Sequence, residues 1–299
     1  MSAAAARPDG EASATSAANA NANAIRAGVR RGLIEHWISL RTPSETAFMV
    51  IGIAVIGVVL WVNRDSEIAP GASLNSFILP SIITIQLLFI TCYGLATVIV
   101  TEREDGTLIR ARSLPNGLRA YSTGLLTRTM CELVEMMVLT LVIAAIILGS
   151  SFDVGPAGVA VILGMLVLGT VALTTFGFVL GTVFKNPRSV GGWGFLVVGA
   201  LAYVSGLVQP LVSMPAWVQV IGQGSPLFWI GQAFRWAFLP PEAGAMEPGG
   251  DWQLGIAFAV VAAWAIVGLV LAPRLLHRVA RRETGSAIEA RRQAALQRA

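Results

Sequence analysis

Long apolar segments alternate with short polar and charged segments along this chain of 299 residues. A helix needs about 20 mainly apolar residues to cross a bilayer, and six segments approach or exceed that length. The pattern therefore predicts an all-α polytopic membrane protein with six transmembrane helices. The predicted spans are 47–62, 74–100, 133–149, 157–184, 190–212 and 252–272.

A different pattern precedes the first span, where apolar residues recur near helical spacing between charged ones. These apolar positions are Ile25, Val29, Leu33, Trp37 and Leu40. The spacing predicts an amphipathic helix that lies along the membrane surface and ends before Pro43. The periodicity alone favours a simple surface anchor.

The segment 215–239 is apolar enough to suggest a seventh span, but Gly222, Gly224 and Pro226 interrupt it. We expect two short helices at the outer membrane surface or dipping into it, because irregular backbone at that depth must be covered by protein or water. Trp217 suits an interfacial position, and Arg235 is expected to anchor the segment at the lipid headgroups.

Both ends of the chain differ from this apolar region, which we take as one transmembrane domain over 25–272. Residues 1–24 are mostly Ala, Asn, Ser and Gly and are expected to be disordered, because they offer few large apolar side chains to bury. Residues 273–299 form a basic tail that is expected to lie in the cytoplasm near anionic lipid.

Composition supports a membrane protein, because only 13% of the residues are charged and 55% are hydrophobic. The 21 Lys and Arg residues divide very unevenly between the segments that connect the spans. Nineteen lie in 1–46, 101–132, 185–189 and 273–299, and two lie in the remaining connections. This asymmetry places both termini in the cytoplasm of a cell whose plasma (inner) membrane the protein spans, and it explains the basic charge without nucleic acid.

Several kinds of chemistry are missing from the sequence. The only lysine, Lys185, follows no glycine-rich loop, so this chain is not a P-loop ATPase. Cys92 and Cys131 form no metal-ligand pattern, and we expect no metal site and no catalytic residues. Only Glu135 intrudes into a span, which argues against transport driven by an ion gradient.

Polar and small residues within the spans have ordinary structural interpretations. Gln86 favours hydrogen bonding between helices over a substrate-facing strip, and Gly177 with Gly181 favours close helix packing. Glu132 and Glu135 are placed to pair with Arg128 on the same helix.

The charged loop after the second span carries the sequence E-R-E-D-G-T-L at Glu102–Leu108, followed by Ser113, Leu114 and Pro115. Together with R-T-P at 41–43 and M-P-A-W-V-Q at 214–219, this loop resembles the type-2 ATP-binding-cassette (ABC) export permeases, and the daunorubicin-resistance type of drug and lipid exporter in particular. The resemblance spans residues from about 25 to 272.

The resemblance implies that a separate P-loop ATPase subunit, present in two copies, hydrolyses ATP and docks on this loop. The implied coupling residues are Glu102, Arg103, Glu104, Gly106, Thr107, Leu108 and Arg110. Gly106 would allow a sharp turn and Thr107 would cap the following helix, while the charged residues would form ion pairs that hold the loop. The implied interface-helix residues are Arg30, Arg31, Glu35 and Trp37, and those of the outer segment are Pro215, Trp217, Pro226 and Arg235.

The sequence thus predicts the permease subunit of an ATP-driven exporter that moves an amphipathic drug, lipid or polyketide-like molecule. A second permease copy, identical or related, would complete the pair, and ATP would be bound only by the partner chain. Two alternatives stay open: a membrane scaffold or assembly factor that transports nothing, and an ion-coupled secondary drug exporter.

Overall fold

The computed structural model describes residues 9–69, 72–149, 154–184 and 186–282. Helices account for nearly all of this part of the chain, and the two strands, β1 (Glu67–Ala69) and β2 (Ala72–Ser73), form one short antiparallel pair. The longer helices are α1 (Asp9–Ser39), α2 (Pro43–Val62), α3 (Leu74–Leu88), α4 (Leu95–Glu104), α6 (Gly117–Leu148), α7 (Pro156–Val183), α9 (Phe195–Val204), α11 (Pro226–Phe238) and α12 (Leu254–Arg282). The shorter helices are α5 (Thr107–Ser113), α8 (Pro187–Ser189) and α10 (Ala216–Gly224).

Five helical stretches among the described residues are long and apolar enough to cross a membrane. They are Pro43–Val62, Leu74–Glu104, Gly117–Leu148, Pro156–Val183 and Leu254–Leu271. The second of these joins α3 to α4 through a π-helical turn, Phe89–Gly94. The prediction of an all-α polytopic membrane protein is therefore confirmed.

The segment predicted as the fifth span is shorter than expected. Its helical part consists of α8, a π-helical turn at Val190–Gly194 and α9, and it ends at Val204 rather than near residue 212. Gly206 adopts a positive φ of 72°, a conformation that ends a helix and that glycine adopts without steric cost. The following residues turn instead towards α10.

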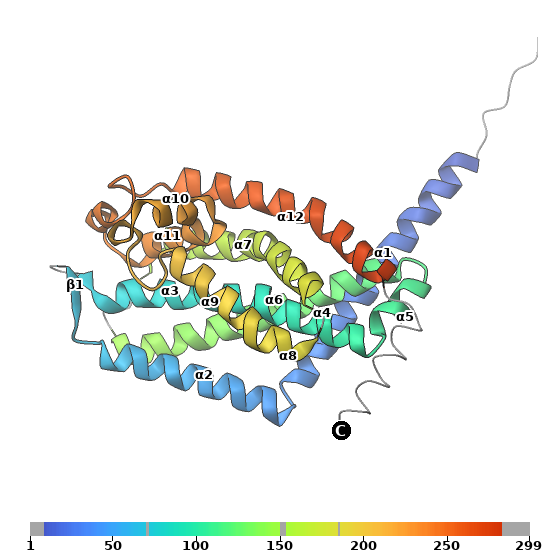
Figure 1. Cartoon of the computed structure of the whole chain (residues 1–299), viewed down its shortest axis with the longest axis horizontal. Coiled ribbons are helices and arrows are strands. Elements are labelled where there is room, and N and C mark those ends of the chain that lie inside the picture. The colour runs from blue at the N-terminus through green and yellow to red at the C-terminus, as the bar shows by residue number, and fades with distance from the viewer. Residues whose placement is uncertain (1–8, 70–71, 150–153, 185, 283–299) are drawn as a thin grey trace, which may run out of the picture.

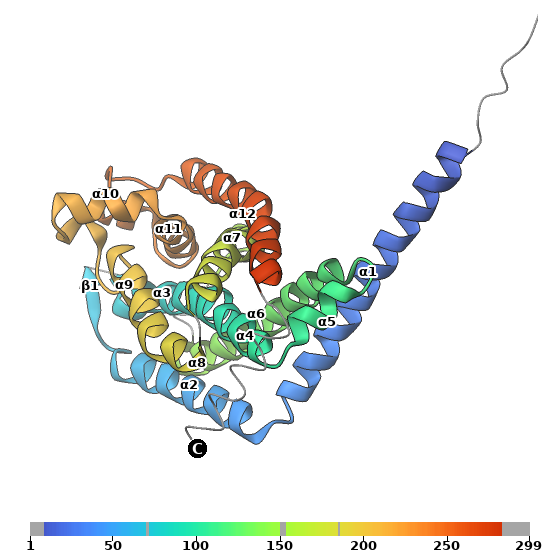
Figure 2. The same ribbon diagram turned by 45° about the vertical axis from the view of Figure 1, so that its right-hand side comes forward.

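The spanning helices run side by side along the long axis of the molecule, and each end of this bundle has its own accessory elements (Figure 1). One end carries α5 and α1, and we call it the α5 end. The opposite end carries α10, α11 and β1, and we call it the α11 end. The N-terminal part of α1 projects away from the bundle (Figure 2).

The structure differs from the expectation of disorder at 1–24, because α1 already begins at Asp9. Alanine occupies seven of the residues in 9–24, and alanine has the highest helix propensity, so this stretch is helical without a large apolar face. Residues 1–8 of the predicted tail lie outside the described residues. At the other terminus α12 continues to Arg282, and 283–299 likewise lie outside the described part.

Helix α7 lies at the centre of the bundle and packs closely where it carries glycine. A Cβ atom on Gly177 would lie 2.5 Å from the carbonyl oxygen of Thr91, and one on Gly181 would lie 3.1 Å from Cβ of Ile99. The predicted close packing is confirmed. Between α3 and α6, Gln86 Nε2 donates a hydrogen bond of 2.8 Å to Thr140 Oγ1, so the predicted helix–helix hydrogen bond is also confirmed.

The segment 215–239 forms the two short helices that were expected, α10 and α11. Helix α11 has 13 residues, which corresponds to roughly 20 Å and is too short to cross a bilayer. Its residues 226–235 are all buried, and it packs against α3, α7 and α12. Protein therefore covers this non-spanning backbone, as an apolar surrounding requires.

Candidate coupling site

The charged loop between the second and third spans contains two sharp reversals with α5 between them. Helix α4 ends at Glu104, and Gly106 then adopts a φ of 75°, the left-handed conformation expected of a tight turn. Thr107 is the first residue of α5 and not its cap, which corrects the expectation. Its hydroxyl accepts a hydrogen bond of 3.3 Å from Arg110 Nη2 instead.

The second reversal connects α5 to α6. Asn116 has a φ of 53°, and a Cβ atom on Gly117 would lie 1.9 Å from the carbonyl oxygen of Ala111, so only glycine fits there. Leu114 lies at the tip of this turn with 63% of its surface exposed, and Pro115 beside it is also exposed. The tip therefore presents an apolar side chain to whatever lies beyond the α5 end.

Glu102 connects the loop to the N-terminal helix. Arg31 Nη2 on α1 donates a hydrogen bond of 2.7 Å to Glu102 Oε1, and Arg31 Nε donates one of 2.6 Å to Glu35 Oε1. The Arg31 guanidinium also lies 5.1 Å from the ring centre of buried Tyr121 at the start of α6. Burial lowers the pKa of Arg31, but the hydrogen bond to Glu35 and the charge of Glu102 together raise this pKa above its usual value. Arg31 is therefore fully charged.

Arg103 connects the same loop to α7. Its Nη1 atom donates hydrogen bonds of 3.1 and 3.2 Å to the carbonyl oxygens of Gly181 and Phe184, at the C-terminal end of α7. A cation at this position satisfies carbonyl groups that have no partner within the helix and interacts favourably with the helix dipole. Adjacent residues of the loop thus bind two different helices.

Glu104 and Arg110, the other charged residues expected in the coupling loop, are exposed. The side chain of Leu108 lies outside the described part of the structure. Among the predicted loop residues, Glu102 and Arg103 therefore bind other helices, whereas Glu104 and Arg110 are exposed.

Helix α1 packs on α6 through small residues. A Cβ atom on Gly28 would lie 2.5 Å from the carbonyl oxygen of Ala120, and one on Gly32 would lie 2.5 Å from that of Gly124. The two backbones are thus in direct contact at successive turns of α1. The spacing of four residues between Gly28 and Gly32 is the sequence signal for this contact, and the apolar periodicity of the helix does not reveal it.

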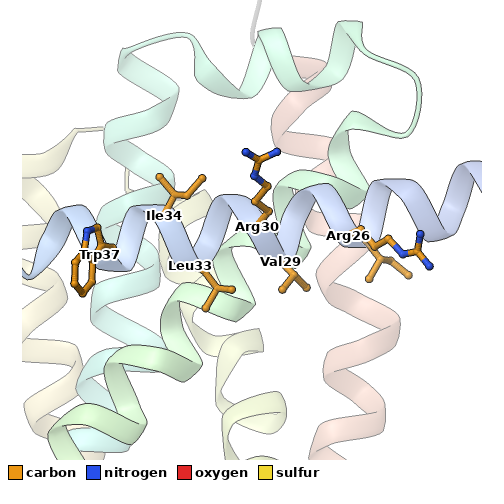
Figure 3. Close-up of a pocket in the computed structure, with 7 residues that line it drawn as sticks. Arg26, Val29, Arg30, Leu33, Ile34 and Trp37 are labelled. Atoms are coloured by element: carbon orange, nitrogen blue, oxygen red, sulfur yellow. The ribbon is translucent and has the colours of Figure 1, made fainter.

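The apolar positions of α1 lie on its open side (Figure 3). Ile25, Leu33 and Trp37 are each about half exposed, and Arg30 lies beside them and is also exposed. Arg41 stacks over Trp37, with 4.6 Å from its Cζ atom to the ring centre. The helix is therefore amphipathic as predicted, but its small and charged side faces the protein and its apolar side is open.

A second group of charges fixes the end of α1 to α6. Arg128 Nε donates a hydrogen bond of 2.6 Å to Glu132 Oε1, as expected. Glu135 does not pair with Arg128 but lies 3.4 Å from His36 Nε2 of α1, which corrects the expectation. Arg128 Nη2 also reaches Glu45 at the start of α2, at 3.4 Å. The charged residues near these helix ends thus pair with one another.

The residues expected at the outer segment lie far from this site, at the α11 end. Pro215 caps α10, Trp217 is 65% exposed, and Pro226 is the first residue of α11. Arg235 was expected at lipid headgroups, but only 2% of its side chain is exposed. It forms a buried pair with Glu247, a partner that the sequence reading missed because it lies in an irregular segment.

The family model described as "ABC-2 type transporter" matches residues 24–239, which is more than half of the chain. The chain belongs to the ABC-2 type transporter family. It is also 26% identical, over 199 residues, to the daunorubicin resistance ABC transporter permease protein DrrB1 of Streptomyces coeruleorubidus. That alignment covers 67% of each chain. The region matched by the family model includes α1 from residue 24 onwards, the charged loop and α11.

Proposed function

We propose that this ABC-2 protein is the permease subunit of an ATP-driven exporter, and that a separate P-loop ATPase docks on α5. ATP would be bound and hydrolysed on that partner, two copies of which would serve a pair of permeases. The pair would consist of two copies of this chain or of this chain and a related one. Membership of the family supports this assignment.

One observation carries the coupling proposal: the loop that presents α5 is bound internally to two other helices. Glu102 binds Arg31 of α1, and Arg103 binds the end of α7. A force on α5 therefore acts directly on the helix beside the membrane and on the central span. The exposed Leu114 at the tip supplies an apolar contact of the kind that a groove on a partner accepts.

The arginine asymmetry supports an orientation with the α5 end in the cytoplasm and the protein in the plasma membrane. Both termini would then be cytoplasmic. In this orientation the open apolar side of α1 and its arginines Arg26 and Arg30 suit the boundary between lipid headgroups and acyl chains.

The proposed substrate is an amphipathic molecule, such as a drug, a lipid or a polyketide-like product. The spans offer apolar surface with few charges, which suits such a molecule. The relative from Streptomyces coeruleorubidus is named for daunorubicin resistance, and a role in drug resistance is proposed here for this chain on that likeness.

The test is co-expression of the chain with its candidate ATPase, followed by purification and measurement of ATP hydrolysis. We expect the ATPase to co-purify with the wild-type chain, and Glu102→Ala or Gly106→Val to reduce both co-purification and hydrolysis. Glu242→Ala removes the same charge from an exposed site at the α11 end and should change neither. Normal association and hydrolysis in both loop variants would overturn the coupling assignment.

A further inference from the structure

The contact between α3 and α11 includes polar side chains although it lies inside the protein. We call it the α3–α11 seam and define it by Phe77, Ser81 and Thr84 on α3 and by Gln232 and Arg235 on α11. The exposed fraction of Ser81, Gln232 and Arg235 is 4%, 1% and 2%. The seam is therefore closed in this structure.

Contacts at both ends of the seam establish which sides of the helices meet. The Arg235 guanidinium lies over the ring of Phe77, with 5.5 Å from its Cζ atom to the ring centre. One turn earlier on α11, a Cβ atom on Gly231 would lie 3.7 Å from Thr84 Oγ1. Ser81 lies between Phe77 and Thr84 on the same side of α3, because residues at i, i+4 and i+7 share a helix face.

Several hydrogen-bonding groups in the seam have no partner within the described part of the chain. They are Ser81 Oγ, both side-chain atoms of the Gln232 amide, and Arg235 Nη1. Buried polar groups are almost always hydrogen-bonded, and leaving them without partners costs free energy. These unpartnered groups therefore favour a state in which they meet water or a polar ligand, and other contacts must hold the seam closed.

The pair of Arg235 and Glu247 is one such contact. Arg235 Nε and Nη2 donate hydrogen bonds of 2.5 and 3.0 Å to the two carboxylate oxygens of Glu247. Glu247 is 6% exposed and precedes α12, so the pair joins α11 to the beginning of the last span. A buried ion pair contributes little net stability compared with apolar residues, but it holds a defined geometry and is costly to break on one side only.

We propose that the α3–α11 seam is a closed part of the substrate path, and that the Arg235–Glu247 pair is the contact that closes it. When the seam opens, Ser81, Gln232 and Arg235 offer hydrogen bonds to hydroxyl or carbonyl groups of an amphipathic substrate. This inference rests on the proposed export function. The polar contacts of the substrate path would then lie inside one permease, between the spanning helix α3 and the short buried helix α11.

The test measures access to Ser81 and needs no identified substrate. Both native cysteines are replaced (Cys92→Ala, Cys131→Ala), Ser81→Cys is introduced, and the complex with its ATPase is treated with a membrane-impermeant maleimide from the α11 side. We expect labelling to become faster by about tenfold during ATP hydrolysis, because opening exposes the seam and relieves its unpartnered groups. Leu79→Cys is the matched control: Leu79 is equally buried on another side of α3 and should stay unlabelled.

A second variant tests the role of the ion pair. Arg235→Gln combined with Glu247→Gln removes both charges together and leaves no unpaired charge in the interior. In this background we expect Ser81→Cys to be labelled without ATP, at a rate close to that of the hydrolysing complex. Retained co-purification of the ATPase shows that the variant is folded.

Two results would overturn the inference. One is labelling of Ser81→Cys that does not change with ATP in a complex that hydrolyses ATP. The other is equal labelling of Ser81→Cys and Leu79→Cys, which would indicate general loosening. Failure of the proposed function has a different signature, namely that no ATPase associates with the chain.

Discussion

The guanidinium of Arg31 lies 2.7 Å from the carboxylate of Glu102, across 71 residues of sequence. The first residue belongs to a helix that precedes the spans, and the second belongs to the end of the second span. This pair connects the N-terminal helix α1 to the segment that presents α5. The two elements are therefore expected to respond together to any change at either of them.

The Arg31–Glu102 pair predicts a non-additive response to substitution. Arg31→Ala and Glu102→Ala should each lower the thermal stability of the purified permease, and the double variant should be no worse than the poorer single variant. The pair is partly exposed, so the coupling energy should be about 1 kcal/mol. Thermal denaturation in detergent measures it, and fully additive effects would show that the two side chains do not interact.

Gly106 predicts a steric effect at the beginning of α5. Alanine at a φ of 75° costs about 1–2 kcal/mol, so Gly106→Ala should reorient α5 and reduce ATP hydrolysis by the complex. Gly255→Ala is the control, because no atom lies within 4 Å of a Cβ at that helical position. Equal hydrolysis by both variants would mean that the turn at Gly106 is dispensable.

The contact between α1 and α6 predicts opposite effects for the same substitution at two glycines. Gly28→Ala should destabilise the protein by about 1–3 kcal/mol, because the methyl group would meet the backbone of α6 at 2.5 Å. Gly52→Ala, in α2, meets no atom within 4 Å and should stabilise the protein by about 0.5–1 kcal/mol through helix propensity. Melting temperatures that move in the same direction would contradict the close contact.

The exposed tip of the loop predicts an effect on association without an effect on folding. Leu114→Asp should leave the melting temperature of the isolated permease unchanged, because the side chain is 63% exposed. It should weaken binding of the ATPase by about tenfold or more if the leucine enters an apolar groove on the partner. Leu114→Met keeps an apolar side chain and should bind normally, so similar affinities of the two variants would exclude a direct contact at Leu114.

Much of the fold follows from simple features of the sequence. Hydropathy located the spanning helices, because an apolar run of sufficient length has few alternatives in a membrane. Gly106 marked a turn because few other residues tolerate that backbone conformation. The end of α9 was less predictable, since the apolar sequence continues past Val204 and only the backbone at Gly206 reveals the break.

The side of α1 that faces the protein could not be read from its apolar periodicity. The helix packs with Gly28 and Gly32, because a bare backbone allows closer approach to α6 than a large side chain does. The partner of Arg235 was also beyond the sequence. Hydropathy assigns an arginine beside apolar residues to the interface, and the neutralising Glu247 lies in a segment without periodicity.

Helix α7 touches both regions of interest. Arg103 binds its C-terminal end, and near its N-terminal end Gly158 lies so close to α11 that a Cβ atom there would lie 3.2 Å from the carbonyl oxygen of Ala237. With 28 residues, α7 extends for about 42 Å as one uninterrupted rod. If α7 pivots at a point along its length, a shift of the end bound by Arg103 would move its N-terminal end in the opposite direction. The timing of events on the two sides of the membrane would then depend on the stiffness of a single helix.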